Sequence, residues 1–290
     1  MFFVDLHHNQ LLPQALKQLS ITSISFLVLC FGVMGLMYAT PVFTAKQLTA
    51  EQVARLAQDR DTGQDSQAEM RMRLYDRQGR VRERRMTFLT RHETGNTNDR
   101  ILVRFTYPND IRNTALLVWE HSDAEDERFL FLPALGRVRR ITGAEKQESF
   151  VGSDLSYEDI GGRNIADYTY QFVEEDATWV APDGAYHPAW RIEAIAKDKT
   201  MNYPRSVSTI LKDQLILVHA DIYNHRDEQV KIFDVTRLDQ ISGIWTVTAL
   251  VMVDKSEQTR TELKTLLIEY NVGLTETDFS RRRLEMVPGQ

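Results

Sequence analysis

Histidines are the first residues to consider for chemistry, because histidine serves both as a metal ligand and as a general base. Five of them follow the apolar N-terminal stretch: His92, His121, His187, His219 and His225. None forms the HExxH pair of a zinc protease, and the sequence has no GxSxG, phosphate-binding glycine loop or CxxC motif. His219 and Asp221 share the face of a predicted strand, but His225 falls in a predicted turn, residues 224–227. We therefore expect no metal site and no cofactor.

A group of carboxylates near the middle of the chain is the second candidate for chemistry. Asp154, Glu158 and Asp159 have the residue type of a general acid and base. Asp154 is also well placed to cap a short helix, and the other two can pair with arginines, namely Arg137, Arg139, Arg140 and Arg163. We favour a structural network of ion pairs. The first three of these arginines have an alternative role, which is to face the phosphate of a lipid headgroup.

Composition narrows the class of protein. The 290 residues include 35 Lys and Arg against 41 Asp and Glu, which gives a formal net charge of −6. This balance argues against nucleic acid as a partner, because binding to phosphates needs a basic surface. Cys30 is the single cysteine and lies in the apolar N-terminal run, so the rest of the chain has no disulfide framework, thiolate metal site or cysteine nucleophile. We expect a protein that is not an enzyme.

Residues 1–44 are predicted to be a signal peptide or an uncleaved signal anchor. The run at residues 21–39 is apolar and long enough to span a bilayer. Val42 and Thr44 offer a tolerable cleavage site, with Ala45 as the new N-terminus, whereas Leu29 makes Cys30 a poor site for lipid attachment. We expect the rest of the chain to lie in the periplasm, either free or anchored to the inner membrane by residues 21–39.

Residues 45–290 are predicted to form one mainly β domain that begins with a helix. Apolar residues recur at helical spacing over residues 46–59, and Thr49 with Gln52 has the spacing of a capping box. About a dozen short segments of period two then follow, mostly joined by turns. Because helices do not recur between them, the sheet must be antiparallel and in meander order. A sheet of that many strands curls or closes.

Two segments interrupt or end this series of strands. Residues 151–166 contain a predicted short helix, which Ser153 or Asp154 caps and the pair Gly161 and Gly162 ends. Residues 278–284 are predicted to be a closing turn or a second short helix.

Large apolar side chains alternate along several predicted strands and would share the inner face of a curled sheet. Nine of them are candidates for the lining of an internal cavity that a ligand could fill: Phe105, Tyr107, Tyr168, Tyr170, Phe172, Trp190, Ile192, Leu250 and Met252. Residues 215–222 and 243–253 are apolar on both faces and need cover on both sides. Periodicity alone favours a filled core, because an alternating pattern does not show that the core is hollow.

Long ordered motifs in the chain resemble the LolA-like outer-membrane lipoprotein-sorting protein family. They are FTYPNDIRNTALLVWE at residues 105–120, RFLFLPALGRVRRI at 128–141 and FVGSDLSYEDIGGRN at 150–164, followed by VKIFDVTRLDQISGIWTVTALVMVD and EYNVGLTETDFSRRRLEM. The resemblance covers most of residues 69–286. It implies an open, curved antiparallel sheet, or half-barrel, with a few short helices covering a hydrophobic cavity for acyl chains. It also implies an association with inner-membrane transporters of the RND or MMPL type.

Three functions remain open at this point. A periplasmic carrier of lipid or lipoprotein acyl chains needs a large apolar cavity. An adaptor that docks on a transporter or envelope complex and carries nothing needs a filled core and an exposed apolar rim. An unrecognised hydrolase needs a buried pair of carboxylates or histidines in a cleft.

Overall fold

The computed structural model describes residues 47–92, 99–121 and 124–286, so the predicted leader at residues 1–44 lies outside the described residues. None of the helices in these ranges is long and apolar enough to cross a membrane. The described chain forms one sheet and three short α-helices, α1 (Ala50–Gln58), α2 (Tyr157–Gly161) and α3 (Arg281–Glu285).

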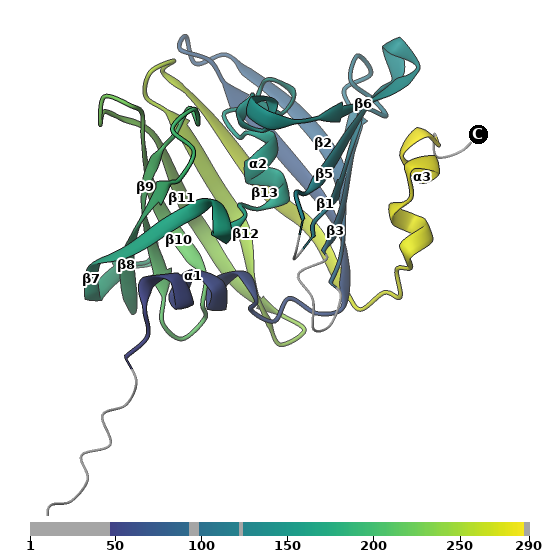
Figure 1. The fold of residues 1–290 in the computed structure, drawn as a ribbon. Coiled ribbons are helices and arrows are strands. Elements are labelled where there is room, and N and C mark those ends of the chain that lie inside the picture. Colours follow the sequence, from purple (N-terminus) through teal and green to yellow (C-terminus); the bar gives the residue numbers. More distant parts are fainter. Residues whose placement is uncertain (1–46, 93–98, 122–123, 287–290) are drawn as a thin grey trace, which may run out of the picture. The chain divides into compact units, whose positions relative to one another are not determined.

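Thirteen antiparallel strands make up the sheet, which is not closed into a barrel (Figure 1). The strands are β1 (Asp65–Tyr75), β2 (Val81–Arg91), β3 (Arg100–Tyr107), β4 (Ala115–Trp119), β5 (Glu127–Leu132), β6 (Arg137–Ile141), β7 (Tyr168–Val180), β8 (Tyr186–Ala196), β9 (Arg205–Leu211), β10 (Leu217–Tyr223), β11 (Gln229–Ile241), β12 (Ile244–Asp254) and β13 (Thr259–Tyr270). The predicted mainly β, antiparallel and curved architecture is thereby confirmed.

The order of the strands shows two meanders joined side by side. It runs from β6 back to β1, then from β13 back to β7, so the first and last strands of the chain are neighbours. The pairing of β1 with β13 aligns Ser66 with Tyr270 and Tyr75 with Arg260. The predicted meander is therefore right within each half and interrupted once, because the chain after β6 crosses to the opposite edge before β7 begins.

The edge strands of this open sheet carry charge. β6 holds Arg137, Arg139 and Arg140, and β7 holds Glu174 and Glu175 on exposed positions. Charged side chains on an edge discourage pairing with another sheet. Edge protection therefore explains the arginine cluster without any ligand.

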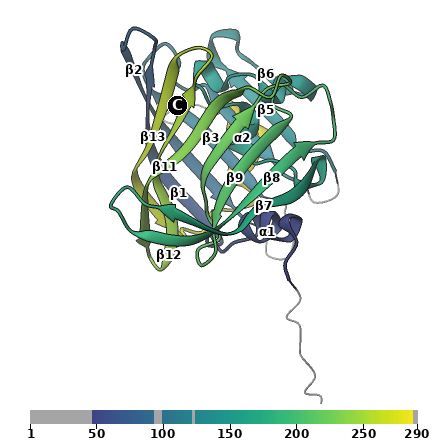
Figure 2. The same cartoon turned by 90° about the vertical axis from the view of Figure 1, so that its left-hand side faces the viewer.

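Helix α1 forms where the sequence predicts it. Thr49 Oγ1 accepts a hydrogen bond from Gln52 N at 3.2 Å, and Gln52 Oε1 accepts one from Thr49 N at 2.9 Å. This capping box satisfies two N–H groups that the first helical turn leaves unpaired. The buried face of α1, formed by Ala50 and Val53, packs against the concave side of β7 to β9 (Figure 2).

Residues 149–165 cross the concave face and are named here the plug segment. It contains α2, which Ser156 caps by accepting a hydrogen bond from Asp159 N at 3.0 Å. The predicted caps, Ser153 and Asp154, are therefore wrong by two or three residues. The predicted end of the helix is right, because Gly162 follows α2 with a positive φ of 78°.

Strands β3 to β5 are apolar on both faces, and each face has its own cover. On the concave side Val103, Leu116 and Leu130 pack in one cluster with Phe150 and Tyr157 of the plug segment. On the other side a second cluster contains Leu102, Leu117 and Phe129, packed against Phe279 and Leu284 in and before α3. The plug segment and the C-terminal residues thus bury opposite faces of the same strands.

Candidate functional site

A cavity of about 660 Å³ lies between the concave face of the sheet, α1 and the plug segment. Ligand cavities in proteins span about 300–1,000 Å³, so its size suits a lipid tail. Its walls come from α1, from the plug segment and from β1, β2 and β7 to β13. Both halves of the sheet therefore contribute to one cavity.

Small side chains at concave positions leave this space open. Ala68 on β1, Ala194 on β8, Ser206 and Ser208 on β9 and Ala220 on β10 all line the cavity. Ser206 and Ser208 are two residues apart and so share a face of their strand. Leucines or phenylalanines at these positions would fill the space, so the cavity is a consequence of residue size.

Four of the nine predicted lining residues lie in the cavity wall. They are Tyr170, Ile192, Leu250 and Met252. Leu250 and Met252 alternate on β12 opposite Leu263 and Thr261 of β13, which places their side chains on one face. Burial raises the pKa of the Tyr170 phenol to about 12, so it lines the wall as a neutral group.

The other five predicted residues lie elsewhere. Phe105 is buried in the core and stacks on Phe150, with ring centroids 5.5 Å apart. Tyr107 is 49% exposed, and Tyr168 is buried beside Ala194 and Ala196. Phe172 and Trp190 pack against the cluster that holds α1 in place.

The three predicted headgroup arginines do not line the cavity. Arg139 pairs with Glu145 at 3.0 Å and Arg140 with Glu127 at 3.4 Å. Arg137 is exposed at the edge of the sheet. Of the four arginines predicted to pair with the plug carboxylates, Arg163 does so, because it lies 3.5 Å from Asp159.

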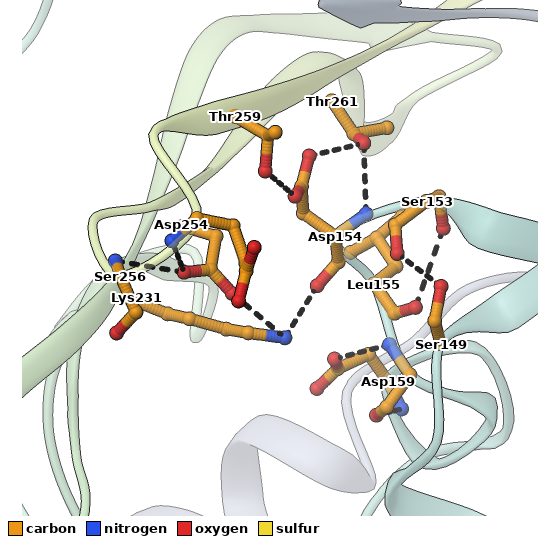
Figure 3. Close-up of polar contacts among 12 residues, drawn as sticks. Ser149, Ser153, Asp154, Leu155, Asp159, Lys231, Asp254, Ser256, Thr259 and Thr261 are labelled. Carbon is orange, nitrogen blue, oxygen red and sulfur yellow. Dashed lines mark hydrogen bonds and ion pairs between the residues drawn. The ribbon is translucent and has the colours of Figure 1, made fainter. Parts of the chain in front are cut away.

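Asp154 fastens one end of the plug segment to the sheet (Figure 3). Its carboxylate accepts hydrogen bonds from the hydroxyls of Thr259 and Thr261, and its backbone N–H donates to Thr261 Oγ1 at 2.9 Å. The buried Lys231 donates to Asp154 O at 2.8 Å and lies 3.9 Å from Asp254. Strands β11 to β13 therefore hold the loop before α2 through buried polar contacts.

Arg128 fastens the other end. Its side chain is 2% exposed, and Nη2 donates to Gly162 O at 3.2 Å and pairs with Asp126 at the same distance. A Cβ added at Gly161 would lie 3.1 Å from Arg128 Nε and from Val118. Glycine therefore lets α2 approach β4 and β5 this closely without displacing Arg128 or Val118. Between these two attachments, Leu155 and Ile160 line the roof of the cavity.

Charge in the cavity wall near α2 is balanced. Burial raises the pKa of the Glu158 carboxyl, which favours its neutral form, although Arg163 opposes the shift. Arg163 stays protonated because Asp159 and Glu158 counteract its desolvation and raise its pKa. Arg163 Nη1 also donates to Ser206 Oγ at 3.4 Å. Near α2 the wall therefore holds a compensated ion pair.

The polar end of the cavity lies where β1 begins and β2 ends. Ser66 Oγ and Thr90 Oγ1 lie 2.6 Å apart on these two neighbouring strands. Thr62 Oγ1 lies 2.7 Å from His92 Nε2, and His92 Nδ1 lies 2.6 Å from Asp99. The cavity wall includes Thr62, Ser66, Thr90 and His92, together with Arg60.

Thr62, His92 and Asp99 form a hydroxyl–imidazole–carboxylate chain, which bears on the hydrolase hypothesis. Efficient acyl transfer by such a chain also needs donors that stabilise the oxyanion. The two N–H groups after Thr62 are engaged, since Gly63 N donates to Asp61 at 2.9 Å and Gln64 N donates to Asn271 at 2.8 Å. The geometry therefore favours a structural polar contact over a catalytic one.

His219 lies between two carboxylates on the sheet, and its neighbours explain it without a metal. Nδ1 lies 2.6 Å from Asp234 and Nε2 lies 3.2 Å from Asp221, and the bond to Asp234 raises the pKa of the imidazole. His225 lies in the turn that the sequence predicts. No cluster of three metal-ligating side chains occurs within residues 47–92, 99–121 and 124–286.

Comparison with solved structures places this geometry in a known fold. A DUF1329 family protein from Desulfovibrio piger is 31% identical, with a TM-score of 0.72 over 81% of this chain and 97% of its own. A domain from Vibrio parahaemolyticus named for outer-membrane lipoprotein sorting is 28% identical, with a TM-score of 0.73 over 82% of this chain and 98% of its own. A LolA superfamily protein from Nitrosomonas europaea shares the fold at 16% identity, with a TM-score of 0.60 over 82% of this chain and all of its own.

Comparison at the level of sequence agrees. A family model described as that of an uncharacterized protein matches residues 97–286, which is more than half of the chain. A search of curated proteins found no match. The resemblance seen in the sequence motifs is thus confirmed. The chain belongs to the DUF1329 family and has the fold of the LolA-like outer-membrane lipoprotein-sorting proteins.

Proposed function

We propose that this protein is a periplasmic carrier that binds acyl chains of lipids or lipoproteins in its cavity and passes them on towards the outer membrane. The observation that carries the proposal is the apolar cavity of about 660 Å³ under α1 and the plug segment. The similar domain from Vibrio parahaemolyticus is named for outer-membrane lipoprotein sorting, which supports the same function.

The physical basis of carriage is removal of the tail from water. Each methylene buried is worth about 0.8 kcal/mol, so ten methylenes supply about 8 kcal/mol before the cost of immobilising the ligand. That gross figure is an upper limit, equivalent to a dissociation constant of about 1 μM, and the cost of immobilising the ligand makes the actual binding weaker. A tail held no more tightly than this is removed by an acceptor with a better site.

Export and partners complete the proposal. The predicted leader at residues 1–44 supports a periplasmic location, either free or anchored by residues 21–39. An RND- or MMPL-type transporter as donor or acceptor rests on the family resemblance alone and stays a prediction.

Native mass spectrometry of the chain purified without detergent tests carriage. We expect masses above that of the bare chain that correspond to bound lipid and disappear after delipidation, then return when lipid is added. A bare mass that persists when lipid is added would contradict carriage and favour the adaptor that docks on an envelope complex without cargo.

A further inference from the structure

Arg60 differs from the other charged groups in the cavity wall because its charge is not compensated. Its Nη1 donates to Trp245 O at 3.0 Å, and among the described residues no carboxylate lies within ion-pair distance of it. Asp61 acts on it from a longer range and accepts a hydrogen bond from Gly63 N. Arg60 is half-buried, and this partial burial lowers the pKa of its guanidinium, while Tyr270 and Asp61 oppose the shift. A partly desolvated cation without an ion-pair partner attracts an anion.

Arg163 is the other arginine of the cavity wall, and acidic neighbours already compensate its charge. It lies 3.5 Å from Asp159, and the pKa of Glu158 responds to it as well. An anion placed beside Arg163 would therefore meet two acidic side chains. Arg60 is the cation in the described wall that favours an anionic ligand.

The Ser66–Thr90 pair supplies a further donor on the same side of the cavity, because Ser66 pairs with Tyr270 across β1 and β13 and Tyr270 acts electrostatically on Arg60. Two hydroxyls that share one hydrogen bond use one of their two protons, and neither oxygen bonds to another of the described residues. The remaining O–H is therefore free to donate. From this pair, Ala68 and Met70 continue along β1 and Phe88 precedes Thr90 on β2, so the lining becomes apolar towards α2.

We propose that the polar end of the cavity, formed by Arg60 with the Ser66–Thr90 pair, holds the anionic headgroup of an acidic lipid whose acyl tail extends along Met70 and Phe88. This inference rests on the proposed carrier function and names its ligand class. The recognised chemistry is a carboxylate or phosphate oxygen attached to an alkyl tail. A neutral amphiphile of the same length would leave Arg60 desolvated and unpaired.

Displacement of a neutral fluorescent probe, N-phenyl-1-naphthylamine, tests the carrier function and the headgroup site separately. Binding of this probe by the purified chain reports an accessible apolar cavity. Dodecanoate, dodecyl phosphate and dodecanol then compete for it, and they share one tail while differing in headgroup. We expect either anion to displace the probe at a concentration about tenfold lower than dodecanol, which matches the strength of a charge-assisted hydrogen bond.

The variants Arg60→Gln and Arg60→Met should remove this preference, so that the anions weaken about tenfold while dodecanol and the probe bind as before. Unchanged binding of the probe shows that each variant is folded. Arg55→Gln is the matched control, because Arg55 is 53% exposed on α1 and paired with Glu51. Phosphate favoured over carboxylate would identify a phospholipid, and the reverse a fatty acid.

Two results would overturn the assignment to Arg60. One is a wild-type chain that binds the three competitors equally, and the other is a preference that survives both Arg60 variants. In the second case, loss of the preference in Arg163→Gln would move the headgroup to α2. Failure of the wild-type chain to bind the probe and dodecanol would instead contradict the carrier function itself.

Discussion

At the scale of single residues, Glu120 is a carboxyl beside the plug segment whose protonation makes the stability of the fold depend on pH. It lies at the end of β4, and its Oε1 would be 3.1 Å from a Cβ on Gly162. Burial, followed by the negative charges of Asp99 and Asp126, raises the pKa of this carboxyl to about 8. The folded protein therefore keeps the proton up to about pH 8, whereas the unfolded chain releases it near pH 4.5.

We expect Glu120 to make the free energy of unfolding fall as pH rises between these two values. The folded state binds the proton over this range and the unfolded state does not, so each step up in pH favours unfolding. The full shift would be worth roughly 5 kcal/mol at about 1.4 kcal/mol per pKa unit, and partial exposure of Glu120 reduces this to ~1–3 kcal/mol. Glu120→Gln should gain that amount relative to the wild type between about pH 5 and 8.5.

Urea titrations at a series of pH values check this expectation. The exposed Glu257, in the turn after β12, provides the control variant Glu257→Gln. Because Glu158 also has a raised pKa, the wild-type slope alone is not diagnostic, and the difference between Glu120→Gln and the wild type is the quantity to measure. A difference that stays constant with pH would contradict a raised pKa at Glu120.

At the scale of elements, contacts with the sheet hold the plug segment in place, because its own helix is not stable alone. Helix α2 has five residues, too few to be stable by itself. Asp154 ties it to Thr259 and Thr261, which lie more than 100 residues further along the chain. Thr261 is fully buried, so its hydroxyl cannot exchange this hydrogen bond for one to water while the strand stays covered.

Asp154→Ala should release the plug segment locally. Loss of the carboxylate leaves the buried hydroxyl of Thr261 and the half-buried hydroxyl of Thr259 without this acceptor, at a cost of ~1–3 kcal/mol. Hydrogen exchange should show amides of residues 149–165 exchanging about ten- to a hundredfold faster, while β8 to β12 keep their protection. Asp213→Ala, in the exposed turn after β9, is the matched control. Equal acceleration across all strands would show that Asp154 supports the sheet as a whole.

The bond between Asp154 and β13 illustrates why the sequence predicts local contacts better than distant ones. Thr49 and Gln52 are three residues apart, so their capping box can be read locally, and the structure confirms it. Asp154 has the residue type of a cap, but its carboxylate bonds to β13, and Ser156 takes over the cap of α2. A local pattern cannot reveal a competitor that lies in a distant strand. Alternation likewise predicts the strands but not the pairing of β1 with β13.

At the scale of the whole molecule, the cavity depends on residue size in strands from both halves of the sheet. The alternation of apolar residues predicts that Ile192, Leu250 and Met252 face the concave side, but it does not show whether space remains in front of them. Small residues such as Ala68 and Ser208, at positions where a core would place leucine, are a sequence signal for that space. Arg60 offers no such signal, because it lies in a polar stretch between α1 and β1.

Filling the space from one side should therefore abolish binding without removing the fold. Ala220 on β10 is 6% exposed and lines the cavity, so the ring in Ala220→Phe would project into the space that a tail occupies. We expect N-phenyl-1-naphthylamine to bind at least tenfold more weakly, in a protein that loses no more than about 1–3 kcal/mol of unfolding free energy. Ala185→Phe, in the exposed turn between β7 and β8, controls for added apolar surface. Because the cavity is empty at this position, a loss of stability much larger than that range would mean that Ala220 faces a filled core, and unchanged binding would place the ligand outside the cavity.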